Sequence, residues 1–375
     1  NYSLKQRYSL LDRISNAIAN IEHHEQDVSY IEAIIETLGV ANLPIFYNKL
    51  IVFLKHKNEA VVITAIKAIG TATDPTLAQH LIHFLGHKNY RPAVMEAFKL
   101  YGVQIIPLLS KNVQDRLQPL SVLRFIPAAM QTFYSKEAVH HLLSILTDND
   151  LTIRLEVVRA LSAIRTTHPH LKFNRYKVVS VIFDECKLHH QTLSAMHTQI
   201  IISYRNRNKF KKEIGDAERD ARTSLLELLE RRLDSGLERI FKLLGLRYQQ
   251  NDVAIAYEGL ISQKQEAQHN AIEFLDNLLT GELKRKLLPI IEESALDISS
   301  EEELQKIKHK IPTELECFKL LLQGNDLKIK LAVLYLITQQ KEPRYLSMVE
   351  NLLNDADPKI RSFALEAQQA ITTEA

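Results

Sequence analysis

The sequence predicts an all-α protein made of stacked helical hairpins, on three observations. The 375 residues include only 10 glycines and 11 prolines, and no segment alternates between apolar and polar residues as a strand would. Apolar residues recur at helical spacing along most of the chain. Signals that end one helix and start another recur with a step of 31 residues, as from Asn58 to Asn89 and from Asp326 to Asp357.

Residues 352–361, LLNDADPKIR, are the clearest of these joints. Asp357 can accept hydrogen bonds from the free N–H groups of a new helix, and Pro358 suits the first helical position. One helix is therefore expected to end at Leu353 and its partner to begin a few residues later. Similar joints are expected at 146–154 and 322–330, and a weaker one at 54–61.

A single amphipathic hairpin cannot bury its apolar stripe, so neighbouring copies must supply the core, as in a solenoid. Arg154, Lys330 and Arg361 fall in the first turn of a second helix, where the helix dipole disfavours a cation. A carboxylate is therefore expected near them, and Asp148 and Asp355 are the candidates.

These joints resemble the HEAT-repeat family, whose units carry Asp before the second helix and Val/Ile followed by Arg/Lys just inside it. The resemblance implies an α-α superhelix that is irregular in the middle. It points to the short HEAT-like variety, because the step is shorter than the usual HEAT length. It also implies a structural ladder of charges between repeats. The candidates for this ladder are Asp148, Asp150, Arg154, Asp326, Lys330, Asp355, Asp357 and Arg361.

Capping and stopping residues place the individual helices. Residues 103–130 contain three prolines and are expected to form short or kinked helices. Gly39, Gly236 and Gly245 are expected to stop or weaken helices. The predicted helices are two within 1–38, then 44–54, one ending at Gly70, 75–102 as a hairpin, 135–146, 151–164, 174–204, 216–246, 252–262, 264–279, 282–294, 301–310, and the last two repeats.

Charge divides the chain unevenly. Residues 1–212 carry 26 Lys/Arg and 16 Asp/Glu, a net charge of +10. Residues 213–375 carry 21 Lys/Arg and 29 Asp/Glu, a net charge of −8, so the whole chain has a net charge of +2. We therefore expect a basic N-terminal part, 1–208, and an acidic C-terminal part, 209–375, that continue into each other. Such asymmetry indicates either that the two ends face different partners or that the basic part faces something acidic.

No chemistry is evident from motifs. Cys186 and Cys317 have no metal-ligand spacing, so a reducing cytoplasm is expected, and no apolar run or signal peptide places the chain in a membrane. His80, His83 and His87 have helical spacing but no Asp, Glu or Cys to complete a zinc set. We expect no catalytic residue, metal or cofactor, and no small-molecule substrate.

Two enzyme classes with HEAT-like folds are alternatives to a scaffold. Di-iron hydroxylases of this kind use several His-Glu dipeptides, and the chain has one, His24-Glu25. HEAT-like DNA glycosylases use aromatic residues, often Trp, with an Asp, and the chain has no Trp. A glycosylase-like enzyme therefore stays an unsupported alternative.

A basic patch is expected where Lys55, Lys57, Lys88 and Arg91 fall on corresponding turns of two successive repeats. Such a patch is either a solvated rim or a surface that attracts phosphate groups or an acidic protein. The acidic C-terminal part disfavours nucleic acid as the ligand. Five further cations extend the patch in the sequence: Arg205, Arg207, Lys209, Lys211 and Lys212.

A second resemblance is carried by residues 233–246 and 271–279, LDSGLERIFKLLGL and AIEFLDNLL. They are similar to segments of soluble HEAT-like modules that lie C-terminal to transporter-like domains in bacterial membrane proteins similar to ATP/ADP translocases and major facilitators. The resemblance implies a cytoplasmic module, associated with a membrane through a preceding domain. The absence of a methionine at Asn1 is compatible with processing, missing residues or excision from a longer chain.

These observations predict a non-catalytic scaffold that binds a protein partner, as the cytoplasmic docking or regulatory module of a bacterial membrane transporter. A module that binds lipid headgroups or nucleic acid is the main alternative. The partner's identity is not encoded in any motif.

Overall fold

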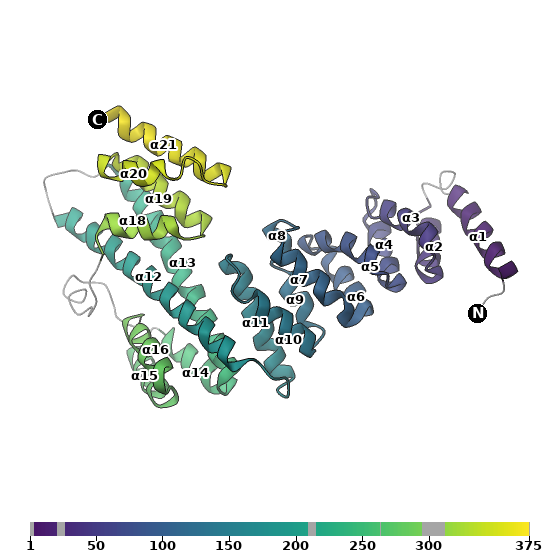
Figure 1. Ribbon diagram of the computed structural model, residues 1–375, viewed down its shortest axis with the longest axis horizontal. Coiled ribbons are helices and arrows are strands. Elements are labelled where there is room, and N and C mark those ends of the chain that lie inside the picture. Colours follow the sequence, from purple (N-terminus) through teal and green to yellow (C-terminus); the bar gives the residue numbers. More distant parts are fainter. Residues whose placement is uncertain (1–3, 21–26, 209–214, 263, 295–311, 375) are drawn as a thin grey trace. The chain divides into compact units, whose positions relative to one another are not determined.

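The computed structural model describes residues 4–20, 27–208, 215–262, 264–294 and 312–374, and every regular element in these ranges is a helix (Figure 1). The predicted all-α class is therefore confirmed for the described residues. The chain forms two compact units, residues 1–148 with 159–172 and residues 149–158 with 173–375. The division expected after residue 208 falls inside the second unit, because the helices before and after it pack together.

The first unit consists of short helices, and a label with η marks a 3₁₀ helix. They are α1 (Leu4–Ala19), α2 (Val28–Ala41), η2 (Pro44–Phe46), α3 (Tyr47–Phe53), α4 (Glu59–Ala72), α5 (Pro75–Ala78), η3 (Gln79–Gly86), α6 (Arg91–Tyr101), η4 (Gly102–Ile105), α7 (Ile106–Gln114), α8 (Leu120–Leu123), α9 (Ile126–Gln131), α10 (Lys136–Ile145) and α11 (Leu151–Thr167), the last divided between the units.

Side-chain caps begin several of these helices where the sequence predicts them. Asn58 accepts a hydrogen bond from the N–H of Ala60 at 2.9 Å, and Asp74 accepts one from Thr76 at 2.8 Å. Each cap satisfies one of the free N–H groups of a helix N-terminus. The proline-containing region divides into the short helices η4 to α9, as expected.

Two glycines let successive second helices approach closely. A Cβ atom on Gly39 would lie 2.7 Å from the Cα of Ala68, and one on Gly70 would lie 2.7 Å from the Cα of Ala97. Gly39 was expected to stop a helix, but it lies inside α2, where it contacts α4. The glycines are 31 residues apart, so the same close contact joins α2 to α4 and α4 to α6.

Side-chain hydrogen bonds also join residues 30 to 32 positions apart. The two partners of each bond lie in different helices. The separations are 32 residues for Thr64–Glu32 and Tyr101–Ile69, 30 for Gln114–Ser144, and 31 for Tyr345–Glu314 in the second unit.

The second unit has longer helices. They are α12 (Arg175–Asn208), α13 (Asp216–Arg247), α14 (Gln250–Leu260), α15 (Gln265–Leu278), α16 (Gly281–Ser294), α18 (Glu314–Gln323), α19 (Leu327–Gln340), η5 (Pro343–Tyr345), α20 (Leu346–Glu350) and α21 (Pro358–Glu374). The helix expected at 301–310 lies outside the described residues.

Helices α12 and α13 differ from the prediction. Helix α12 continues through Arg205 and Arg207, where a break after Tyr204 was expected, and α13 is unbroken at Gly236 and Gly245. Gly236 has a packing role, because a Cβ atom there would lie 3.2 Å from Nδ1 of His189. A mid-helix glycine therefore marks a close contact here and not a weak point.

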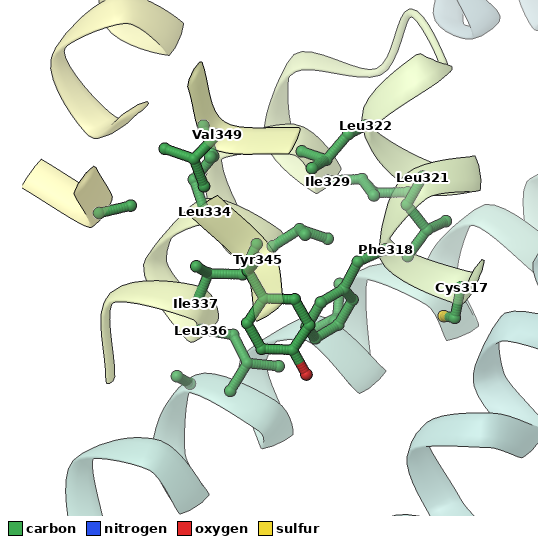
Figure 2. Close-up of a cluster of buried hydrophobic side chains, with 14 of the residues drawn as sticks. Cys317, Phe318, Leu321, Leu322, Ile329, Leu334, Leu336, Ile337, Tyr345 and Val349 are labelled. Atoms are coloured by element: carbon green, nitrogen blue, oxygen red, sulfur yellow. The ribbon is translucent and has the colours of Figure 1, made fainter. Parts of the chain in front are cut away.

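The C-terminal helices close a core over α12 and α13. Phe318 and Tyr345 lie at its centre with ring centroids 5.3 Å apart, and Ile329, Leu334 and Ile337 surround them (Figure 2). Residues of α13, from Ala221 to Leu229, complete the cluster. The last two hairpins therefore share one core with the long helices.

Candidate binding surface and buried charge networks

The predicted basic patch lies on turns of the first unit. Lys55 and Lys57 are exposed after α3, and Lys88 is exposed before α6. Arg205 and Arg207 belong to α12 of the second unit. Lys209, Lys211 and Lys212 lie outside the described residues. Of the predicted patch, the structure therefore describes the side chains of four residues: Lys55, Lys57, Lys88 and Arg91.

Arg91 is the patch member with a fixed side chain. Its Nε donates a hydrogen bond to the carbonyl oxygen of Leu85 at 2.7 Å, and its guanidinium carbon lies 3.5 Å from the centroid of the Phe125 ring. Such stacking is typical of arginine, whose planar cation is weakly hydrated. The turn before α6 is thereby attached to the segment after α8.

Arg124 is a second cation at the same ring, and the sequence prediction missed it. Its guanidinium carbon lies 4.8 Å from the Phe125 centroid. Burial lowers the pKa of Arg91, and the charge of Arg124 lowers it further. Arg124 lies in the irregular region 103–130, so no repeat spacing could align it with Lys88 or Arg91.

Gly86 explains why these segments meet. A Cβ atom there would lie 2.9 Å from Cγ2 of Val122, so the turn after η3 rests directly on α8. Because only a glycine fits this contact without displacement, the position of Arg91 relative to Arg124 depends on it.

The three histidines near this turn do not form a metal site. Burial lowers the pKa of His83, and the charge of His87 contributes. Within the described ranges, no group of three or more His, Cys, Asp or Glu side chains is placed to hold a metal ion. His83 and His87 instead pack near the ring of Phe84.

The residues of the predicted ladder occupy two kinds of position. Asp150, Asp326 and Asp357 cap α11, α19 and α21 by accepting backbone hydrogen bonds. The others connect segments: Lys330 lies 3.6 Å from Asp355, Arg361 donates to the carbonyls of Asp355 and Ala356, Asp148 pairs with Arg116, and Arg154 pairs with Glu185 at 2.9 Å. Arg116 and Glu185 are ion-pair partners that the prediction lacked.

Glu314 is the centre of a buried network in the second unit. Its carboxylate accepts hydrogen bonds from Arg222 at 2.7 Å, Tyr345 at 2.9 Å, Gln340 at 3.1 Å and Arg344 at 3.2 Å. Burial opposes the charge on Arg222, but Glu314 and Glu218 together outweigh it, so the pKa of this arginine is raised. The network joins α13, α18, α19 and η5.

Glu185 is the centre of a second network. Its Oε1 faces Arg154, and its Oε2 accepts a hydrogen bond from Nε of Arg239 at 2.8 Å. Glu185 and Arg239 are each 1% exposed, so both charges depend on this pairing. No local pattern could predict it, because the partners lie 54 residues apart.

His189 and Ser294 lie as close together as a general base and its serine nucleophile, but the serine hydroxyl does not donate its proton to the imidazole. His189 Nε2 lies 3.0 Å from the Ser294 hydroxyl, which donates to the carbonyl of Ile290 at 2.7 Å. The imidazole must therefore donate to the hydroxyl oxygen. Burial lowers the pKa of His189 to about 4, with Arg239 contributing, so it is neutral at pH 7.

His197 and Glu293 form a further buried pair, with Nδ1 and Oε1 3.5 Å apart. Burial raises the pKa of Glu293 to about 7. Both cysteines are free and buried, and burial raises the pKa of the Cys186 and Cys317 thiols to about 12. They are protonated at neutral pH and therefore poor nucleophiles.

One helical run, residues 91–114, is long and apolar enough to cross a membrane by length and composition. Gly102 breaks its backbone with a φ of 66°, and Phe98, Ile106 and Leu109 are buried in the first unit. In this structure the run is a pair of core helices.

Comparisons with known proteins identify no family. No family model matches the chain, and no curated protein matches it. Matching solved structures include three crystal structures of engineered proteins from a structural genomics consortium. They are 13%, 13% and 12% identical over 92%, 87% and 87% of this chain and 95%, 96% and 98% of their own, with TM-scores of 0.24, 0.17 and 0.15. Scores this low carry no argument about fold or function.

Proposed function

We propose that this chain is a non-catalytic scaffold that binds a protein partner through helical hairpins of the short HEAT-like type, stacked within each unit. The observation that carries the proposal is the recurrence of contacts between residues 30 to 32 positions apart, as in Thr64–Glu32 and Gln114–Ser144. Stacked hairpins present extended surfaces, and binding is their common use.

The buried charges support a structural role over a catalytic one. Glu185 and Glu314 are held by arginines from other helices, so their charges are already compensated. A catalytic carboxylate needs a substrate within hydrogen-bond reach. In our proposal these groups hold long helices together.

Exposed apolar side chains at hairpin ends support a protein partner. Val40 and Ile45 are 76% and 73% exposed at the end of α2 and in η2, and Leu100 and Val103 are 59% and 43% exposed at the end of α6 and in η4. Apolar side chains left exposed at hairpin ends are candidates for contact with a protein partner.

Affinity capture with chemical crosslinking from the source cells tests the proposal. A protein crosslinked to the wild-type chain should be lost with Val40→Glu combined with Ile45→Glu, and should remain with the exposed control Lys99→Gln. A stoichiometric cofactor in the purified chain, or capture that ignores the double substitution, would overturn it.

The proposal extends to the docking or regulatory module of a bacterial membrane transporter. Its support is the resemblance carried by residues 233–246 and 271–279, which lie in α13 and α15. The coding sequence upstream of Asn1 tests this extension. Predicted membrane spans there would support it, and a start codon immediately upstream would remove it while leaving the scaffold proposal unaffected.

A further inference from the structure

We propose that Arg91 and Arg124, together with the ring of Phe125, form a binding site for a phosphate monoester group. The proposal goes beyond the scaffold function and does not depend on it. Both guanidinium groups lie at one ring, with carbon-to-centroid distances of 3.5 and 4.8 Å. The two carbon atoms are therefore no farther apart than the sum of these distances.

Among the described residues, no carboxylate lies within ion-pair distance of Arg91 or Arg124. Two cations at one ring repel each other, and an anion within reach of both would offset this repulsion with two attractions.

Hydrogen-bond donors are also available. The Nε of Arg91 is used by Leu85, but neither of its Nη groups donates to a protein acceptor in the part of the chain that the structure describes. The same holds for the side chain of Arg124, which is exposed. Two guanidinium groups offer the paired donors that fit phosphate oxygens.

Arg91 is held in place before any ligand arrives. The hydrogen bond to Leu85 and the stack on Phe125 fix its guanidinium group, so binding need not order this side chain. Gly86, which keeps the turn against Val122, maintains the same arrangement from the backbone.

The charge indicates the ligand class. A phosphate monoester is close to a dianion at pH 7, and two arginines neutralise it. Lys88, three residues before Arg91, is exposed and adds a cation to the same turn. Leu120, one helical turn before Arg124, is 48% exposed, so a lipid headgroup is one source of the phosphate and a soluble phosphate is the other.

Two binding assays on the full chain test the site and separate the sources. One is sedimentation with vesicles of phosphatidylcholine containing phosphatidic acid, against phosphatidylcholine alone. The other is calorimetric titration with inorganic phosphate. Wild type should bind in at least one assay, and Arg124→Gln should weaken that binding about tenfold, as should Arg91→Gln.

The control is Lys99→Gln, which removes an exposed cation paired with Glu96 and should bind as wild type. The side chain of Arg124 is exposed, so Arg124→Gln should fold and tests the site even if Arg91→Gln does not fold. Binding to vesicles alone assigns a lipid source, and binding to inorganic phosphate assigns a soluble one. Binding in neither assay, or equal binding by Arg124→Gln and wild type, overturns the site.

Discussion

The two units bury different kinds of side chain. Among the described residues, the buried polar groups of the first unit are uncharged: Thr64, Ser110 and Asn112. The second unit buries charged and titratable groups. These are Glu185, His189, His197, Arg222, Arg239 and Glu314.

The two units also differ in helix length. Short helices in the first unit meet at Gly-Ala contacts and at capped turns, so apolar packing and local hydrogen bonds position them. Helices α12 and α13 extend over more than thirty residues each and contact several separate segments. Buried ion pairs fix which part of a long helix meets which segment, because an unpaired buried charge excludes other registers.

The largest expected effect is the loss of a buried charge partner in the second unit. Glu314→Ala should lower the free energy of unfolding by about 3–5 kcal/mol, because Arg222 stays buried without its carboxylate. Hydrogen exchange read by mass spectrometry should show the loss in α13 and α18 to η5. The exposed Glu366→Ala should change stability by less than about 0.5 kcal/mol. A small effect of Glu314→Ala would contradict the contrast between the units.

The first unit should respond most to apolar truncation. Ile66 of α4 is fully buried, so Ile66→Ala should cost about 2–5 kcal/mol through lost contacts and a cavity. Denaturant unfolding measures this value. Val52→Ala, at a position 63% exposed in α3, is the matched control and should be nearly neutral. Equal effects at both positions would show that α4 is not packed as described.

A pH dependence should belong to the second unit. Burial raises the pKa of Glu293 from 4.5 to about 7, so the folded state favours the protonated carboxyl. The stability that this group contributes is fully present below pH 4.5 and is lost as the pH rises through 7. Relative to Glu293→Gln, wild type should lose about 1–2 kcal/mol between pH 5 and pH 8. Thermal melts at both pH values check this, with the neighbouring exposed Glu292→Gln expected to follow wild type. A constant difference between wild type and Glu293→Gln would refute the raised pKa.

The smallest effect should come from a cap in the first unit. Asp74→Ala removes the acceptor for Thr76 and for the Tyr47 hydroxyl, at a cost of about 0.5–2 kcal/mol. Asp74→Asn keeps a capping oxygen and should recover most of the loss in chemical denaturation. If both variants lost the same stability, the Tyr47 contact and not the cap would be the larger contribution.

Local features were predictable from sequence, and distant ones were not. Caps at Asn58, Asp74 and Ser135 lie within three residues of the groups that they satisfy, so residue order alone reveals them. Arg222 and Glu314 lie 92 residues apart, and no periodicity connects them.

In the candidate site too, residues at repeat spacing were predictable and residues that depend on distant contacts were not. The 31-residue step predicted one patch for Lys55, Lys57 and Lys88, and the structure shows each of the three exposed on a turn. Arg124 was missed because prolines disrupt the step around it. The pairing of Arg154 with Glu185 was missed because the buried position of Glu185 depends on α13.

The contacts of Gly39 and Gly70 have a consequence for how this protein tolerates changes in length. Adding one residue inside α4 would rotate everything after it by about 100°, so Gly70 would turn away from Ala97 and a larger side chain would take its place. Adding residues to the turn at 54–58 leaves both helix faces unchanged. Insertions should therefore be accepted in the turns of the first unit and rejected within the helices between them.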